Sequence, residues 1–252
     1  MTNIRIVTIG DPHLREISDG TANLILIADY LKANNTLFDI VVVLGDYHDL
    51  AGAESILSIV GKPVIFVKGN HDGVSSCGSG SSNNGSNVIS MNGYQLILVG
   101  ICGSPSMFFW EFDFNRSDVN KNLPTIIFNH GPIQPGSGGQ TDCGSGSSCS
   151  NWSAYNGYAC TLKVETDKFT NLIAFYAGHV HCYSNQKIGN TLYVTEDNLG
   201  GNGPAGDYIG FSCFNNNSVI YTRLNYKTGT TIPNCFGGTV MCDNPVCGLR
   251  IY

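Results

Sequence analysis

Short runs of apolar residues, rich in isoleucine and valine, recur along most of the chain. They are too short for typical helices, and their β-branched content favours buried strands. We assign these runs to strands: Ile4–Ile9, Ile40–Leu44, Val64–Val67, Leu96–Val99, Thr125–Phe128, Leu172–Tyr176 and Leu192–Thr195. Between the first three runs lie two segments with apolar residues at helical spacing, Ala22–Leu31 and Ala51–Val60. This alternation predicts an α/β fold with a parallel sheet built from βαβ units.

Other segments interrupt the alternation. Met107–Trp110 is an apolar cluster, which we expect to be a short helix packed in the core rather than a platform for substrate. After Gly189 the chain becomes rich in β-forming residues and glycine, which predicts a second sheet packed on the first. Two segments rich in glycine, serine and asparagine, residues 75–90 and 132–150, are either insertions without a role or walls that shape access to a site.

The histidines are concentrated in polar motifs that follow the predicted strands. All six occur in five motifs: Asp11-Pro12-His13, Gly45-Asp46-Tyr47-His48-Asp49, Gly69-Asn70-His71-Asp72, Asn129-His130-Gly131 and Gly178-His179-Val180-His181. Each motif lies at the C-terminal end of a strand, which is the edge where open α/β sheets bind ligands. We therefore expect the five motifs to converge on one crevice. Asp, Asn and neutral His side chains are ligands that hold pairs of divalent metal ions in hydrolases.

Composition narrows the classes of function. The chain has 252 residues, of which 42% are apolar, so we treat residues 1–252 as a single domain with one sizeable core. A net charge of −6 and a pI of 5.4 argue against a broad basic surface for nucleic acid. They do not exclude a phosphorylated substrate, because bound metal ions would reverse the local field. No run of about 18 apolar residues occurs, so no membrane-spanning helix is expected.

Two features point to different compartments. Residues 1–5 run directly into the first predicted strand and do not resemble a signal peptide, which favours the cytoplasm. Ten cysteines and a low charged fraction of 13% instead favour an oxidising or extracellular setting. Cys143 and Cys149 flank a Gly/Ser segment, and further cysteines crowd a C-terminal tail, residues 232–252. Their spacing allows disulfides without fixing which cysteines pair, so the sequence does not decide the compartment.

In order and identity, the five motifs resemble those of the calcineurin-like metallophosphoesterase superfamily, over roughly residues 4–195. The resemblance implies an α/β fold, a four-layer αββα sandwich of mixed sheets with a dinuclear metal site at the C-terminal strand ends. The implied ligands are Asp11, His13 and His181 for one ion, Asn70, His130 and His179 for the other, and Asp46 as the bridge between them. A bridging anion offsets the repulsion between two cations about 4 Å apart. Nitrogen and oxygen ligands suit two divalent ions of Mn, Fe, Co, Ni or Zn without selecting one.

The resemblance also implies a mechanism. A hydroxide that bridges the metals attacks phosphorus in line, and the metals neutralise phosphate oxygens in the transition state. His71 is implied to be the general acid that protonates the leaving alkoxide, with Asp72 orienting its ring. Asp49 is a candidate for supporting a ligand or forming a turn. The family pattern does not assign His48, which either contacts substrate or takes no part in the reaction.

Details of the motifs bear on the branch of the superfamily. Leu50-Ala51 follows Asp49, where protein Ser/Thr phosphatases carry Arg-Gly, and purple acid phosphatases have a Tyr ligand at the position of Asp49. The forms Asp-Pro-His-Leu, Gly-Asn-His-Asp and Gly-His-Val-His are most similar to the small phosphodiesterase branches, such as the class III cyclic-nucleotide and glycerophosphodiester enzymes. We therefore expect a phosphodiesterase that acts on a small phosphorylated substrate. The alternatives are a phosphomonoesterase or nucleotidase, a nuclease, and a metal-bound scaffold without activity. The sequence does not determine the oligomeric state.

Overall fold

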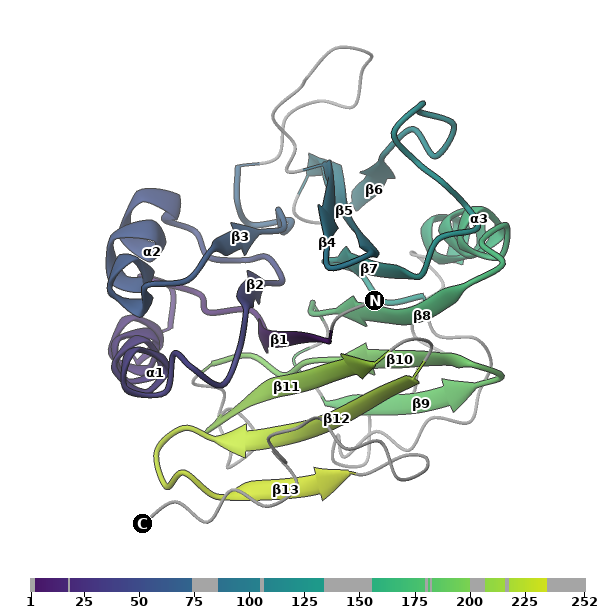
Figure 1. Ribbon diagram of the computed structural model, residues 1–252. Helices are drawn as coiled ribbons and strands as arrows, with labels where there is room; N and C mark the ends of the chain where they lie inside the picture. The colour runs from purple at the N-terminus through teal and green to yellow at the C-terminus, as the bar shows by residue number, and fades with distance from the viewer. Residues whose placement is uncertain are drawn as a thin grey trace.

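The fold is known from a computed structural model of the chain (Figure 1). The structure describes residues 3–17, 19–73, 86–104, 107–133, 156–179, 181, 183–199, 207–215 and 218–234. Most of the two Gly/Ser-rich segments and of the cysteine-rich tail lies outside these ranges, so the expectations for them remain predictions.

The described chain contains mostly strands. The helices are α1 (Gly20–Ala33), α2 (Leu50–Leu57), followed by a 3-10 turn η1 (Ser58–Val60), and α3 (Asn156–Thr166). The strands are β1 (Ile4–Ile9), β2 (Ile40–Val43), β3 (Val64–Phe66), β4 (Asn87–Met91), β5 (Tyr94–Ser104), β6 (Met107–Glu111), β7 (Thr125–Asn129), β8 (Leu172–Ala177), β9 (Ser184–Ile188), β10 (Thr191–Thr195), β11 (Tyr208–Asn215), β12 (Ser218–Asn225) and β13 (Thr231–Asn234).

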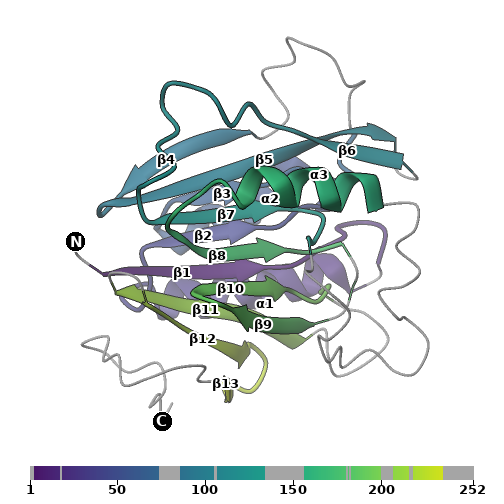
Figure 2. The ribbon, with the colours of Figure 1, turned by 90° about the vertical axis from the view of Figure 1, so that its right-hand side faces the viewer.

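The strands form two mixed sheets that pack face to face (Figures 1 and 2). The first sheet has the order β13-β12-β11-β1-β2-β3, and β1, β2 and β3 are parallel in it. The second has the order β4-β5-β7-β8-β10-β9, with β6 paired to β5. In the second sheet β5, β7, β8 and β10 are parallel. In the first sheet the parallel strands form one end, and antiparallel strands follow beside β1. In the second sheet the parallel strands are central, with antiparallel β4 and β9 at the edges.

Helices cover the outer face of each sheet. Ile6 of β1 and Phe128 of β7 belong to the apolar core between the sheets. Leu24 of α1 packs on the far face of the first sheet, and Leu162 of α3 packs on the far face of the second. Figure 1 shows α1 and α2 on one side of the two sheets and α3 on the other. The four-layer αββα sandwich that the resemblance implies is confirmed.

Strand β2 explains why some strands are continuous apolar runs in the sequence. Ile40 and Val42 point into the core between the sheets, whereas Val41 and Val43 contact the cluster beneath α1. Successive side chains of a strand point to opposite faces, and both faces of β2 are covered. Apolar residues are therefore favourable at every position of such a strand, and the alternation of a half-exposed strand is absent.

The seven predicted strands and the helical segments Ala22–Leu31 and Ala51–Val60 are confirmed, but the division of the strands between sheets is wrong in part. Strands β5, β7 and β8 belong to the second sheet and do not continue the first. After Gly189 only β10 belongs to the second sheet, while β11, β12 and β13 extend the first. A strand that is buried on both faces is apolar in either sheet, so its sequence does not show to which sheet it belongs. The apolar pattern therefore could not predict this division.

The short helix expected over Met107–Trp110 is also wrong. This segment lies in β6, which pairs antiparallel with the end of the long strand β5, with Phe108 opposite Gly103. The side chain of Phe109 is 51% exposed, so this residue is not part of a buried helical face. Pairing with the long neighbouring strand satisfies the backbone groups that a helix would otherwise satisfy internally.

Two buried cysteines, Cys102 of β5 and Cys213 of β11, are disulfide-bonded. The compartment of the protein stays a prediction from the sequence.

No helix among the described residues is long and apolar enough to cross a membrane.

Candidate metal centre

Five loops bring their polar motifs to one edge of the sandwich. Asp11, Asp46 and Asn70 follow β1, β2 and β3 of the first sheet. His130 and His179 follow β7 and β8 of the second sheet. The C-terminal ends of parallel strands share one edge, and here the corresponding edges of both sheets meet. The structure thus brings together motifs that are far apart in the sequence.

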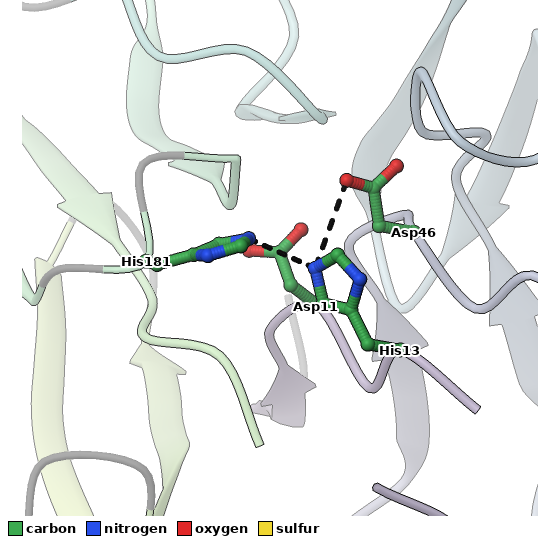
Figure 3. A group of neighbouring side chains, drawn as sticks. All are labelled: Asp11, His13, Asp46 and His181. Carbon is green, nitrogen blue, oxygen red and sulfur yellow. Dashed lines mark hydrogen bonds and ion pairs between the residues drawn. The ribbon is translucent and has the colours of Figure 1, made fainter. Parts of the chain in front are cut away.

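The first group of converging ligand atoms belongs to Asp11, His13, Asp46 and His181 (Figure 3). One ligand atom of each side chain lies within 4.8 Å of those of the others. Nε2 of His13 lies 2.8 Å from Nε2 of His181 and 3.9 Å from Oδ2 of Asp46. All four side chains point toward one another, as expected for the ligands of a shared cation.

The second group contains Asn70, Asp46, His130 and His179. Oδ1 of Asn70 lies 2.8 Å from Nε2 of His130 and 2.9 Å from Nδ1 of His179. The two ring nitrogens are 3.2 Å apart, and Oδ2 of Asp46 is 3.3 Å from Nε2 of His130. Asp46 therefore belongs to both groups. It occupies the place that a carboxylate bridging two ions would need.

Two observations indicate that the candidate ligand atoms suit divalent metal ions. Oδ1 of Asp11 is buried and accepts no hydrogen bond from a described residue, although Nδ1 of His130 lies 3.3 Å away, so this oxygen is available to a cation. Nδ1 of His130 lies 2.8 Å from the carbonyl oxygen of Leu44. In the neutral ring, whose Nδ1–H donates to this oxygen, Nε2 presents its lone pair to a metal ion. Without metal, burial opposes the charged form of His130, but Asp46 and Asp11 raise its pKa to about 9, so metal binding displaces a proton. Nitrogen and carboxylate ligands of this kind suit Mn, Fe, Co, Ni or Zn.

Burial and nearby charges determine the protonation states of the candidate ligands. Burial and the charge of His130 lower the pKa of His179 to about 3, and burial and His13 lower that of His181 to about 4. Both rings are neutral at pH 7, which is the form of histidine that binds metals. Burial opposes ionisation of Asp46, but the charge of His130 and its hydrogen bond lower the pKa of Asp46 below its usual range.

His71 lies beside the two groups, on a more open side. Its side chain is 36% exposed, and its backbone N–H donates to Oδ1 of Asp46 at 2.9 Å. The carboxylate of Asp72 accepts hydrogen bonds from the backbone N–H groups of His48 and Gly69, at 2.7 Å each. Asp72 therefore holds the second and third motif loops together. The carboxylate that faces Nδ1 of His71 is Glu16, at 3.8 Å.

The other two residues singled out in the second motif have different surroundings. Asp49 accepts a hydrogen bond from the N–H of Gly52 at the start of α2 and forms an ion pair with Arg15. This carboxylate caps a helix, which agrees with a turn-forming role. His48 instead faces the site, because its Nε2 lies 2.6 Å from the carboxylate of Glu16.

A family model for calcineurin-like phosphoesterases matches residues 4–183 of the chain. The chain belongs to the calcineurin-like phosphoesterase family. The match covers all five motifs, and membership implies a metal-dependent phosphoester hydrolase. The cluster of Asp and His side chains that can hold a metal ion agrees with this assignment. No curated protein matches the sequence of this calcineurin-like phosphoesterase significantly.

Solved structures share the phosphoesterase fold at low sequence identity. The purple acid phosphatase PPD1 of yellow lupin has a TM-score of 0.53 at 13% identity, and the similarity covers 92% of this chain and 53% of the lupin chain. GAP50, the anchor in the inner membrane complex of Plasmodium, has a TM-score of 0.51 at 14% identity, covering 94% of this chain and 90% of that chain. At these identities the similarity shows the fold alone.

Backbone strain is concentrated in the motif loops of this phosphoesterase. The non-glycine residues with positive φ in the described chain are His13, Arg15, Asp46, His48, His179, His181 and Asn92. All but Asn92 lie in the motif loops or beside them. Side chains with a Cβ rarely adopt this conformation, and its cost of about 1–3 kcal/mol is tolerated when the surrounding structure enforces it. The fold therefore positions the ligands through strained backbone.

The glycines of the motifs leave room for close contacts. Gly45, with φ of +102°, lies where an added Cβ would be 2.4 Å from Nδ1 of His130. A Cβ at Gly69 would be 2.1 Å from the backbone nitrogen of Asp46. A Cβ at Gly178 would be 2.7 Å from Oδ2 of Asp11. A larger residue at any of these positions would displace a candidate ligand.

We expect Gly45→Ala to weaken metal binding and to lower stability by more than about 1 kcal/mol, because it adds backbone strain and a collision with His130. Gly189→Ala is the matched control, since Gly189 also has positive φ but an added Cβ would meet nothing within 4 Å. Metal titration and thermal unfolding of both variants measure the difference. Equal metal affinity in the two variants would contradict the steric account.

Sequence reasoning missed Glu16, which contacts three imidazole rings at the edge of the centre. Burial opposes its ionisation, but the hydrogen bond from His13 and the charges of His48 and His71 lower the pKa of Glu16. The spacing between His13 and Glu16 was the one available signal, because residues three apart meet when the chain turns. No family motif includes Glu16.

Proposed function

We propose that the chain is a phosphodiesterase that hydrolyses a small phosphodiester, with two divalent metal ions at the candidate centre and His71 as general acid. Asp11, His13 and His181 would hold one ion, Asn70, His130 and His179 the other, and Asp46 both. When bound, the ions would acidify a water molecule as the nucleophile and neutralise the charge of the phosphate oxygens.

One observation carries the proposal. The two ligand groups share Asp46, and His71 lies beside them on a side open to solvent. A phosphate held at the centre would therefore have the buried ligands on one side and His71 within reach on the other. The hydrogen bond from the backbone of His71 to Asp46 couples the position of this residue to that of the shared ligand.

Charge at the open side supports a diester rather than a monoester as substrate. Glu16 is about half exposed, and its lowered pKa keeps it ionised at neutral pH. A phosphomonoester carries about two negative charges at pH 7, whereas a diester carries one. The carboxylate therefore repels a monoester more strongly. The similarity of the motifs to those of the small phosphodiesterase branches supports the same choice.

The test compares bis-(p-nitrophenyl) phosphate with p-nitrophenyl phosphate. The protein is stripped of metal, and Mn²⁺, Zn²⁺, Ni²⁺ or no ion is restored. We expect turnover that depends on metal and favours the diester. A preference for the monoester would replace the proposal by a phosphomonoesterase. Absence of turnover with every ion, while metal still binds, would favour a scaffold function instead.

A further inference from the structure

Glu16 lies over the edge of the candidate centre because the chain turns directly after the first motif. The backbone N–H groups of Glu16 and Ile17 both donate to the carbonyl oxygen of His13, at 3.2 and 3.1 Å. This turn brings the Glu16 side chain back to the ring of His13. The side chain is 47% exposed, so burial alone does not hold it in place.

The contact with His13 determines which ring nitrogen is free to bind a metal. Oε2 of Glu16 lies 2.8 Å from Nδ1 of His13, and Nε2 on the other side of the ring faces His181 and Asp46. A neutral imidazole carries a single N–H, and a carboxylate can only accept. Nδ1–H therefore donates to Glu16, and Nε2 presents its lone pair to the first ligand group. The charge of a carboxylate partner also makes the ring a stronger ligand.

His48 connects this contact to the rest of the site. Its Nε2 lies 2.6 Å from the same oxygen of Glu16 and 3.0 Å from Nδ1 of His13. Its backbone N–H donates to Asp72 at 2.7 Å, and its φ is +60°. A histidine fixed in this way limits the movement of the half-exposed Glu16 side chain. Asp72, His48, Glu16 and His13 thus form a chain of contacts that ends at the candidate metal ligands.

We propose that Glu16 is a positioning residue of the metal centre, which fixes the tautomer and orientation of His13 while His48 holds Glu16 in place. The inference rests on the proposed function, because it takes His13 as a metal ligand. It assigns a role to His48, and it predicts an asymmetric effect. Loss of Glu16 lowers the affinity for the ion held by Asp11, His13 and His181. The affinity for the ion held by Asn70, His130 and His179 changes little.

Calorimetric titration of metal-free protein with Mn²⁺, and separately with Zn²⁺, tests the inference. Removal of such a carboxylate partner commonly weakens a metal site by about 10–100-fold. We expect Glu16→Ala to lose affinity by this factor for one of the two ions. In Glu16→Gln the amide oxygen still accepts from Nδ1, so most of the affinity is restored. Rescue by glutamine separates positioning of the ring from a requirement for charge.

Controls distinguish the possible failures. Glu54→Ala removes an exposed glutamate from α2 and is expected to leave both affinities unchanged. Thermal unfolding of each metal-free variant shows whether it is folded. Equal metal affinity in folded Glu16→Ala and in the wild type would overturn the inference and leave the proposed function standing. Failure of the wild type to bind either ion would overturn both.

A second variant tests the contribution of His48. We expect His48→Ala to lower the affinity for the same ion as Glu16→Ala does, but by a smaller factor. Nε2 of His48 contacts both Glu16 and Nδ1 of His13, so the two single losses are coupled. The double variant is expected to lose less affinity than the product of the two single losses. Strictly additive losses in the double-mutant cycle would contradict this chain of contacts and show that His48 acts on the centre by another route.

Discussion

Asp46→Asn is expected to abolish metal-dependent hydrolysis almost completely. The substitution keeps the size of the side chain and an oxygen that can accept from the N–H of His71, but it removes the charge that both ligand groups share. The bridging carboxylate offsets the repulsion between two ions, so we expect the affinity for at least one of them to fall. A loss of a few kcal/mol in transition-state stabilisation lowers kcat/KM by at least about 100-fold.

The measurement combines kcat/KM for a diester with the number of ions bound per chain. Asp118→Asn is a matched control, because it makes the same chemical change at an exposed ion pair with Arg116. That variant is expected to retain both activity and metal content. Full activity of Asp46→Asn with two ions bound would rule out a bridging role for this carboxylate.

His71→Ala is expected to have an effect that depends on the leaving group. A general acid helps most when the departing oxygen is strongly basic, and such assistance is commonly worth about 10²–10⁴-fold. p-Nitrophenolate is a weak base that leaves with little help, whereas an alkoxide requires a proton. We therefore expect the variant to lose much more activity toward an alkyl diester than toward bis-(p-nitrophenyl) phosphate.

The comparison is made on a series of diesters whose leaving groups increase in basicity. His48→Ala is the matched histidine variant. It is expected to lower the activity toward all members of the series by a similar factor, since His48 contacts Glu16 and His13 and is proposed to act on the metal site. A steeper dependence on leaving-group basicity in His71→Ala alone would identify the acid. Parallel losses across the series in both variants would remove His71 from this role.

The strands and the motif loops could be predicted from the sequence because local features determine both. A doubly covered strand such as β2 is apolar at each position, and a polar motif such as Gly69–Asp72 shortly after a strand lies at its end. The five motifs also occur in the order of the family. These features together predict that the polar motifs lie at one edge of the fold.

The features that could not be predicted depend on contacts between distant segments. The separation of β5, β7 and β8 from the first sheet is determined by pairing, which leaves no local trace in an apolar strand. The strand at Met107–Glu111 depends on the extended end of β5. Glu16 was missed because its role arises from a turn and from His48, which lies 32 residues later in the chain.

The candidate ligands come from both sheets, and this origin affects how the protein responds to metal supply. Each ion would contact loops of the first sheet, through Asp46 and its neighbours, and loops of the second, through His130, His179 or His181. A bound ion is then a cross-link between the two halves of the sandwich. A ligand that binds only the folded state adds about 2.7 kcal/mol of stability at a concentration 100 times its dissociation constant. The availability of metal would thus set the lifetime of the folded protein as well as its activity.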